Sequence, residues 1–117
     1  MISKVVPKLP YINKFATLQF YVQQLGFTLR SDYGEYLILD SPAAELHFFA
    51  YPNLVPSKSD FMIYLRVQKG IEELYLKLQK AGIAIHPHGQ LETKSWRQRE
   101  FAVTDPNGTL LTFGQAI

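Results

Sequence analysis

The stretch Trp96–Gly114, W-R-Q-R-E-F-A-V-T-D-P-N-G-T-L-L-T-F-G, decides how this chain folds. The apolar and β-branched run Phe101–Thr104 predicts one strand, and Thr109–Phe113 predicts a strand that returns beside it. Asp105–Gly108 joins them as a tight turn, because proline fixes its own φ while asparagine and glycine tolerate positive φ. The second half of the stretch is therefore predicted to be a β-hairpin.

Charged residues surround the only tryptophan, which lies just ahead of this hairpin. Arg97, Arg99 and Glu100 follow Trp96 within four positions. A large amphipathic ring beside charged groups is typical of the edge of a small-molecule groove. A tryptophan that caps the core would give the same pattern, so both interpretations stay open at this point.

Composition places the chain among ordinary globular proteins. Its 117 residues fit one domain, with 47% hydrophobic and 19% charged residues. The absence of cysteine excludes disulfides, thiolate metal sites and cysteine nucleophiles. A net charge of +2 without a basic stripe argues against nucleic acid as a partner. The apolar runs are too short for a membrane span or a signal peptide, so we expect a cytoplasmic protein with no membrane partner.

The first half of the chain predicts a strand, a helix and three more strands. The first strand, Val5–Pro10, contains two prolines, so we expect it at a sheet edge or exchanged between subunits. Asn13 is the predicted N-cap of the helix, and Gly26 its end. Apolar residues fall at helical spacing between them: Phe15, Leu18, Val22 and Leu25, with Tyr21 beside them. The three strands are Phe27–Arg30, Glu35–Leu39 and Glu45–Tyr51.

The second half repeats this order after a linker at 53–60, and we place the two modules at about 1–52 and 61–117. Its predicted elements are a strand at Phe61–Val67, a helix at Ile71–Ala81, a strand at Ile83–Ile85, a loop at His86–Ser95 and the hairpin. An offset of 56 aligns Gln24–Leu29 with Lys80–Ile85. The same offset places Val6 on Met62, Leu18 on Leu74 and Phe20 on Leu76.

A single βαβββ unit leaves one face of its sheet uncovered. We therefore predict an α+β fold for the single domain 1–117, in which two βαβββ modules with mixed sheets pack together and enclose a cleft.

Several motifs of the chain resemble those of a known superfamily. F-Y-V-Q-Q-L-G-F at Phe20–Phe27 and D-P-N-G at Asp105–Gly108 resemble the glyoxalase/bleomycin resistance/dioxygenase superfamily, also called vicinal oxygen chelate. Leu9-Pro10, F-F-A-Y-P at Phe48–Pro52 and the ending Asp105–Leu111 are most similar to transposon-type bleomycin resistance proteins. The resemblance implies a homodimer, and with Val5–Pro10 it implies exchange of the N-terminal strands.

Enzymes of this superfamily bind a divalent metal through the first and fourth strands of each module. The resemblance carries those positions onto Val6, His47, Phe61 or Met62, and Thr112. Only His47 is able to ligate a metal, so we expect no metal, no cofactor, no catalytic residue and no enzymatic activity. A metal-dependent lyase, dioxygenase or thiol transferase remains the alternative, as does a structural module with a degenerate cleft. His86 and His88 are interpreted as parts of a polar loop.

The resemblance also implies that a flat bithiazole tail lies between two aromatic rings in a dimer cleft. The corresponding positions are Tyr36 and Trp96, and each stacked pair contributes about 0.5–1.5 kcal/mol beyond area burial. The predicted function is non-enzymatic binding and sequestration of a planar, bleomycin-type antibiotic. The predicted ligand-binding residues are Tyr36, Trp96, Arg97, Arg99, Glu100 and His47.

The charges near Trp96 leave the identity of that ligand open. Bleomycin is cationic, whereas Arg97 and Arg99 flank the tryptophan and His47 stands where the transposon-type protein has an acid. One reversed sign near the ligand is able to decide which molecule binds, since two charges at 4 Å interact by about 4 kcal/mol at an effective dielectric constant near 20. Another planar ligand, including an anionic one, therefore remains an alternative.

Overall fold

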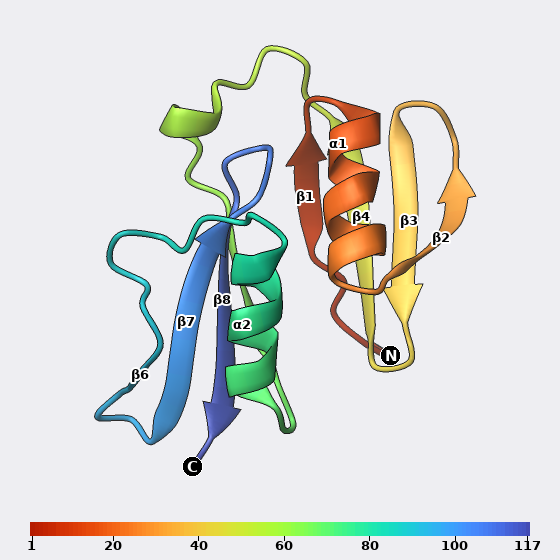
Figure 1. The fold of residues 1–117 in the computed structure, drawn as a ribbon. Helices are drawn as coiled ribbons and strands as arrows, with labels where there is room; N and C mark the ends of the chain where they lie inside the picture. Colours follow the sequence, from red (N-terminus) through yellow and green to blue (C-terminus); the bar gives the residue numbers. More distant parts are fainter. The chain divides into compact units, whose positions relative to one another are not determined.

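The computed structural model describes all 117 residues and contains two four-stranded mixed sheets, each with a helix against one face (Figure 1). The chain divides into two compact units. The first unit comprises Met1–Phe61 and Pro106–Gly108, and the second comprises Met62–Asp105 and Thr109–Ile117. The predicted α+β class with two βαβββ modules is confirmed.

The sheet of the first unit has the spatial order β1 (Lys8–Tyr11), β4 (Ala44–Ala50), β3 (Tyr36–Ser41) and β2 (Thr28–Asp32). β1 runs parallel to β4, and the other neighbours are antiparallel. β1 begins at Lys8 rather than Val5, and before it the carbonyl of Pro7 accepts a bond from the amide of His47 on β4. β1 pairs with β4 of its own chain, and exchange between chains stays a prediction.

Alternation along β4 divides this sheet into a face covered by the helix and a face turned away from it, which we call the far face. Leu46 and Phe48 are buried on the helix side, where the rings of Tyr21 and Phe48 lie 4.8 Å apart. His47 and Phe49 are half-buried and point to the far face, because successive side chains of a strand alternate.

The first helix begins as α1 (Lys14–Leu18) and continues as the π-helical segment Gln19–Gln24 (Figure 1). Asn13 is its N-cap as predicted, since its Oδ1 accepts the amide of Ala16 at 2.8 Å. Its buried side chains are Thr17, Phe20 and Tyr21, whereas Phe15 is 77% exposed. The apolar spacing therefore predicts the helix but does not identify its buried face.

The second unit repeats the topology in the order β5 (Met62–Arg66), β8 (Leu110–Ala116), β7 (Gln98–Thr104) and β6 (Glu92–Thr93). β5 runs parallel to β8 and the other pairs are antiparallel. The helix α2 (Ile71–Lys80) buries Ile71 and Leu78 completely and covers one face of the sheet (Figure 1). Tyr75 packs edge-on against Phe101 of β7 with ring centroids 5.0 Å apart.

Two predicted segments differ from the structure. Ile83–Ile85 is not a strand and forms only one bridge, from Ile85 to Val103. Pro87 follows closely and has no amide hydrogen to extend the pairing, so the edge of this sheet is formed by β6 instead. The linker 53–60 contains a short 3₁₀ helix at Pro56–Lys58.

The predicted D-P-N-G turn between β7 and β8 is confirmed. The Oδ1 atom of Asp105 accepts the amide of Thr109 at 2.9 Å, which closes the turn. Gly108 has φ of +84°, and a Cβ there would lie 2.1 Å from the carbonyl oxygen of Pro56, so only glycine fits. The amide oxygen of Asn107 accepts the backbone N–H of Ile12 at 2.8 Å, which ties this turn to the start of the first helix.

Candidate ligand-binding site

The far face of the first unit carries a hydrogen-bonded chain of three side chains. The hydroxyl of Tyr36 on β3 lies 2.7 Å from Nδ1 of His47 on β4, and Nε2 of His47 lies 2.6 Å from a carboxylate oxygen of Glu45. A carboxylate only accepts, so Nε2 donates and, in the neutral imidazole, Nδ1 accepts from the Tyr36 hydroxyl. The rings of Tyr36 and His47 meet edge to face at 5.3 Å.

Positive charges balance the carboxylate in this chain. The ammonium of Lys4 lies 2.7 Å from the other oxygen of Glu45, and Lys8 lies 5.5 Å from the centroid of the Tyr36 ring. The hydrogen bond from Lys4, followed by that from His47, holds the pKa of Glu45 below its ordinary value. The hydrogen bond of its hydroxyl to His47 thus orients the Tyr36 ring, and the nearby carboxylate of Glu45 is paired with the ammonium of Lys4.

The far face of the second unit is organised around a buried carboxylate. Glu100 on β7 is 6% exposed, and its Oε2 atom accepts two hydrogen bonds. The Nε1–H of Trp96 donates one at 2.8 Å, and the hydroxyl of Tyr64 on β5 donates the other at 2.7 Å. Trp96 as a residue remains 61% exposed, so its polar edge is anchored while much of its surface is accessible, with the ammonium of Lys94 5.9 Å from the ring centroid.

Tyr64 reaches Glu100 only because Gly114 has no side chain. β8 lies between β5 and β7, and Gly114 of β8 pairs with Glu100. A Cβ on Gly114 would lie 1.7 Å from the Tyr64 hydroxyl oxygen. Burial, and then the bond to Glu100, raises the pKa of Tyr64, so its hydroxyl stays protonated and donates. Sequence reasoning missed Tyr64; its signal was an aromatic residue on the first strand of a module whose last strand carries a glycine.

A tight turn between β6 and β7 presents the tryptophan. The amide of Arg97 donates to the carbonyl of Lys94 at 3.1 Å, and the amide of Lys94 donates to the carbonyl of Gln98 at 2.7 Å. The turn ends at Arg97, whose φ of 64° lies in the left-handed region. Arg97 is exposed on this turn.

Arg99 does not join the cluster around Trp96. Alternation along β7 turns it to the helix side, where its Nε donates to Glu72 of α2 at 2.7 Å. That bond lowers the pKa of Glu72 and engages the guanidinium charge. The structure therefore brings together Trp96 and Glu100 in one unit, and Tyr36 and His47 in the other, and it separates Arg99 from both groups.

A cavity of about 200 Å³ opens beside Glu100 in the second unit. Its walls include Glu100, Thr112 and the loop residues His86, His88 and Gln90. The backbone amide of His88 donates to Nδ1 of His86 at 3.1 Å, so this hydrogen bond lies within the loop that carries both histidines. Gly89 packs where a Cβ would lie 2.7 Å from that of Ala102, so the loop lies tightly against β7.

The positions that the superfamily's enzymes use for a metal do not fit one in this chain. Val6, Met62 and Thr112 offer no imidazole or carboxylate, and both ring nitrogens of His47 are engaged by Tyr36 and Glu45. No group of three or more histidine, aspartate or glutamate side chains is placed to hold a metal ion.

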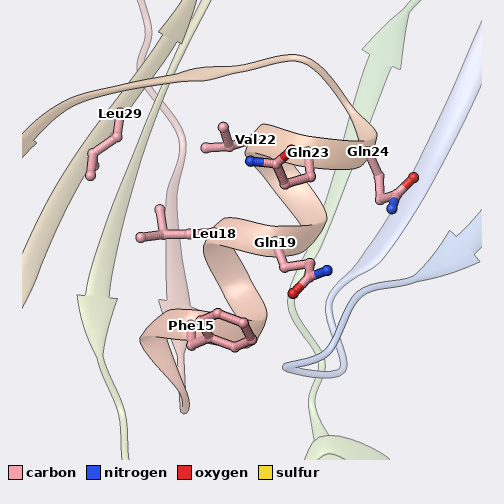
Figure 2. A pocket seen from close by; sticks show the side chains of 7 residues that line it. All are labelled: Phe15, Leu18, Gln19, Val22, Gln23, Gln24 and Leu29. Carbon is pink, nitrogen blue, oxygen red and sulfur yellow. The ribbon is translucent and has the colours of Figure 1, made fainter.

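A larger hollow, about 640 Å³, lies elsewhere, on the outer side of the first helix. Figure 2 shows Phe15, Leu18 and Val22 following one another along the helix, with Leu29 of β2 beyond them. Its polar groups are the amides of Gln19, Gln23 and Gln24, and no charged side chain lines it. An anchored aromatic ring on each far face, and the buried charge on that of the second unit, make each of these faces a better candidate site than this hollow.

Comparison with known proteins gives consistent matches over nearly the whole chain. A bleomycin resistance protein of Klebsiella pneumoniae is 32% identical over 116 residues, covering 95% of this chain and 90% of the relative. One of Geobacillus stearothermophilus is 28% identical over 127 residues, covering 96% of each.

No helix has the length and apolar character needed to cross a bilayer.

Solved structures give the same result. A bleomycin-binding protein in complex with bleomycin has a TM-score of 0.84 at 30% identity, covering 99% of this chain and all of the other. A bleomycin resistance determinant encoded on a transposon has a TM-score of 0.85 at 31% identity, covering 98% of each chain. The family model for the superfamily matches residues 12–113. The chain therefore belongs to the glyoxalase/bleomycin resistance protein/dioxygenase superfamily.

Proposed function

We propose that this protein binds a planar antibiotic of the bleomycin type and sequesters it without changing it chemically. The relatives named as bleomycin resistance proteins, and the similar structure solved with bleomycin, support this proposal. The observation within this chain that carries it is the state of Trp96. The residue is 61% exposed, yet its indole N–H is bound to the buried carboxylate of Glu100.

An exposed tryptophan that is fixed at its polar edge suits the stacking of a flat ligand. Its apolar face loses little further freedom when a ring covers it, because the hydrogen bond already orients the indole. Tyr36 in the first unit follows the same design, since the bond to His47 holds its hydroxyl. Each unit thus supplies one anchored aromatic ring as a ligand contact.

Binding without catalysis is the function that the side chains support. The metal positions of the superfamily's enzymes lack ligating groups here, and His47 is engaged at both nitrogens. A lyase or dioxygenase of this fold depends on such a metal, and its substrate would have no activating group in this chain.

The fluorescence of the only tryptophan tests the proposal directly. Titration with metal-free bleomycin should change the emission of Trp96 saturably, and calorimetry should give the same dissociation constant. Trp96→Phe retains an aromatic ring and should retain most of the affinity by calorimetry, whereas Trp96→Ala should weaken binding by about 1–3 kcal/mol. A calorimetric titration without heat, together with unchanged fluorescence, contradicts the assignment.

We extend the proposal to a homodimer, as the superfamily resemblance implies. Val5, ahead of β1, is 86% exposed and Phe15 is 77% exposed, which leaves apolar surface for a second chain to cover. Light scattering at micromolar concentration should give the mass of two chains, and a stable monomer contradicts this part of the proposal.

A further inference from the structure

The carboxylate of Glu100 is buried without an ionic partner. It is 6% exposed, and none of the salt bridges in the structure includes it. Acidic side chains are rarely buried unless they are paired, because removing a charge from water is costly. Glu45 in the first unit follows the rule, since Lys4 and His47 both bind it. Glu100 departs from it.

The two bonds that Glu100 accepts leave one of its oxygens unused. Tyr64 and Trp96 are neutral donors, and both bind Oε2. They stabilise the negative charge but do not cancel it. Oε1 accepts from neither donor, and Glu100 lines the cavity of about 200 Å³. The buried charge is therefore positioned beside a space that another group is able to enter.

The cations around this cavity are engaged with other groups. Lys94 also lines it, but its ammonium binds Glu92. Arg66 does not line the cavity, and its guanidinium donates to the neutral side chain of Gln98 at 2.9 Å, which leaves its charge uncancelled. Arg99 is paired with Glu72. The remaining polar walls, His86, His88, Gln90 and Thr112, carry no fixed charge. Glu100 is therefore the one charged wall of the cavity that has no ionic partner.

The size of the cavity limits what enters it. Pockets that enclose a whole drug-sized molecule measure roughly 300–1,000 Å³, so this one accommodates a terminal group only. A carboxylate is best matched by a planar N–H donor or an ammonium, which forms short charge-assisted bonds.

We propose that this cavity is a subsite for a cationic nitrogen group of the ligand, such as an amidinium, a guanidinium or an ammonium, which binds Oε1 of Glu100. The inference rests on the proposed function and assigns the charge of the ligand at Trp96. It selects a cationic planar ligand over the anionic alternative that Arg97 and Arg99 left open.

A pair of small probes tests the subsite apart from the drug. Benzamidine is a planar cation and benzamide is its neutral counterpart, and the emission of Trp96 reports both because its indole binds the same carboxylate. Benzamidine should bind about tenfold more tightly than benzamide, with an affinity that falls as salt is added. Equal affinities, or no salt dependence, overturn the subsite, and this comparison needs no variant.

Substitution then locates the charge. Glu100→Gln keeps an oxygen acceptor for Trp96 and Tyr64 and should lower the affinity for benzamidine about tenfold or more, while leaving that for benzamide unchanged. Glu35→Gln removes the same charge from an exposed position of the first unit and should change neither affinity. Circular dichroism shows whether each variant folds. If Glu35→Gln weakens benzamidine binding as much as Glu100→Gln does, the effect is one of net charge and the subsite is refuted.

Bleomycin itself separates this inference from the proposed function. If bleomycin binds wild type and Glu100→Gln with equal affinity, the proposed function is supported and the subsite is refuted. If benzamidine binding depends on Glu100 but bleomycin does not bind, the subsite is supported and the bleomycin-type function is refuted.

Discussion

The two sheets carry different side chains at the same place in the same topology. In the first unit, Tyr36 pairs with Phe49 on the far face, one residue before the buried pair formed by Leu37 and Phe48. In the second unit, Glu100 pairs with Gly114, one residue before the buried pair formed by Phe101 and Phe113. An aromatic ring in one unit thus corresponds to a carboxylate in the other.

The difference continues into the electrostatics of the two far faces. The carboxylate of the first face, Glu45, is bound by Lys4 and by His47. The carboxylate of the second face, Glu100, is bound only by neutral donors. The repeat therefore specifies backbone pairing and the helix-covered core, while the far faces have diverged into one whose carboxylate is paired with cations and one whose buried carboxylate is bound by neutral donors.

Gly114 should produce the largest effect, because the arrangement of the second face depends on it. In Gly114→Ala the new Cβ displaces Tyr64, and Glu100 loses a buried hydrogen bond, which should cost about 1–3 kcal/mol of unfolding free energy. Denaturant unfolding measures the loss. In a Tyr64→Ala background the same substitution should cost little, and a full additional loss there would contradict the assigned contact.

Each anchored ring should contribute strongly to binding. Trp96→Ala and Tyr36→Ala should each weaken binding of bleomycin by about 1–3 kcal/mol, as truncation of an interface anchor does. Trp96→Ala also removes one of the two hydrogen bonds to buried Glu100 and should lower the free energy of unfolding by about 1–3 kcal/mol, so binding is measured well below the unfolding midpoint of each variant. Calorimetry on both variants compares the two units, and an effect confined to one of them would assign the ligand to that unit.

The pH dependence of stability should separate the two carboxylates. Lys4, and then His47, lowers the pKa of Glu45 in the folded chain, so the stabilisation is present above its ordinary value of 4.5 and is lost as pH falls through the lowered folded value. Wild type should melt at a higher temperature than Glu45→Gln near pH 7, and the difference should close on acidification. A difference that persists at pH 3 would show that Glu45 acts through packing rather than charge.

The sequence predicted the topology well because the repeat is carried by local signals. Asn13 caps its helix, the D-P-N-G turn closes the last hairpin, and Gly26 and Gly82 both have positive φ at the ends of their helices. The offset of 56 also matches the strands, since Leu9 pairs with Phe48 as Leu65 pairs with Phe113.

Through the helices that offset is wrong by one residue. The N-caps Asn13 and Gly70 are 57 apart, so the first helix holds one residue more before its glycine, which its π-helical segment accommodates. The offset of 56 accordingly places the buried Tyr21 on the exposed Lys77, whereas an offset of 57 places it on the buried Leu78. A π-helical segment depends on tertiary packing, and apolar spacing does not reveal it.

The candidate site was predicted only in part. Trp96 and Glu100 are close in sequence and were therefore predicted to lie at one site, and the structure joins them by a hydrogen bond. Tyr64 was missed because its contact with Glu100 spans 36 residues and crosses an intervening strand. The separation of Arg99 from Glu100 follows from strand alternation, which places consecutive side chains on opposite faces.

The smallest effect is expected at the turns that open the two central strands, where the units again differ. The first unit uses Gly34, with φ of +90°, and the second uses Arg97, with φ of 64°. A non-glycine residue in this region costs about 1–2 kcal/mol, so Arg97→Gly should raise the free energy of unfolding by about 1 kcal/mol at most, and Gly34→Ala should lower it. If the ligand at Trp96 is cationic, loss of the Arg97 charge should leave its affinity unchanged or raise it. Weaker binding in Arg97→Gly, measured by calorimetry at low salt, would restore an anionic ligand and make Arg97 its contact.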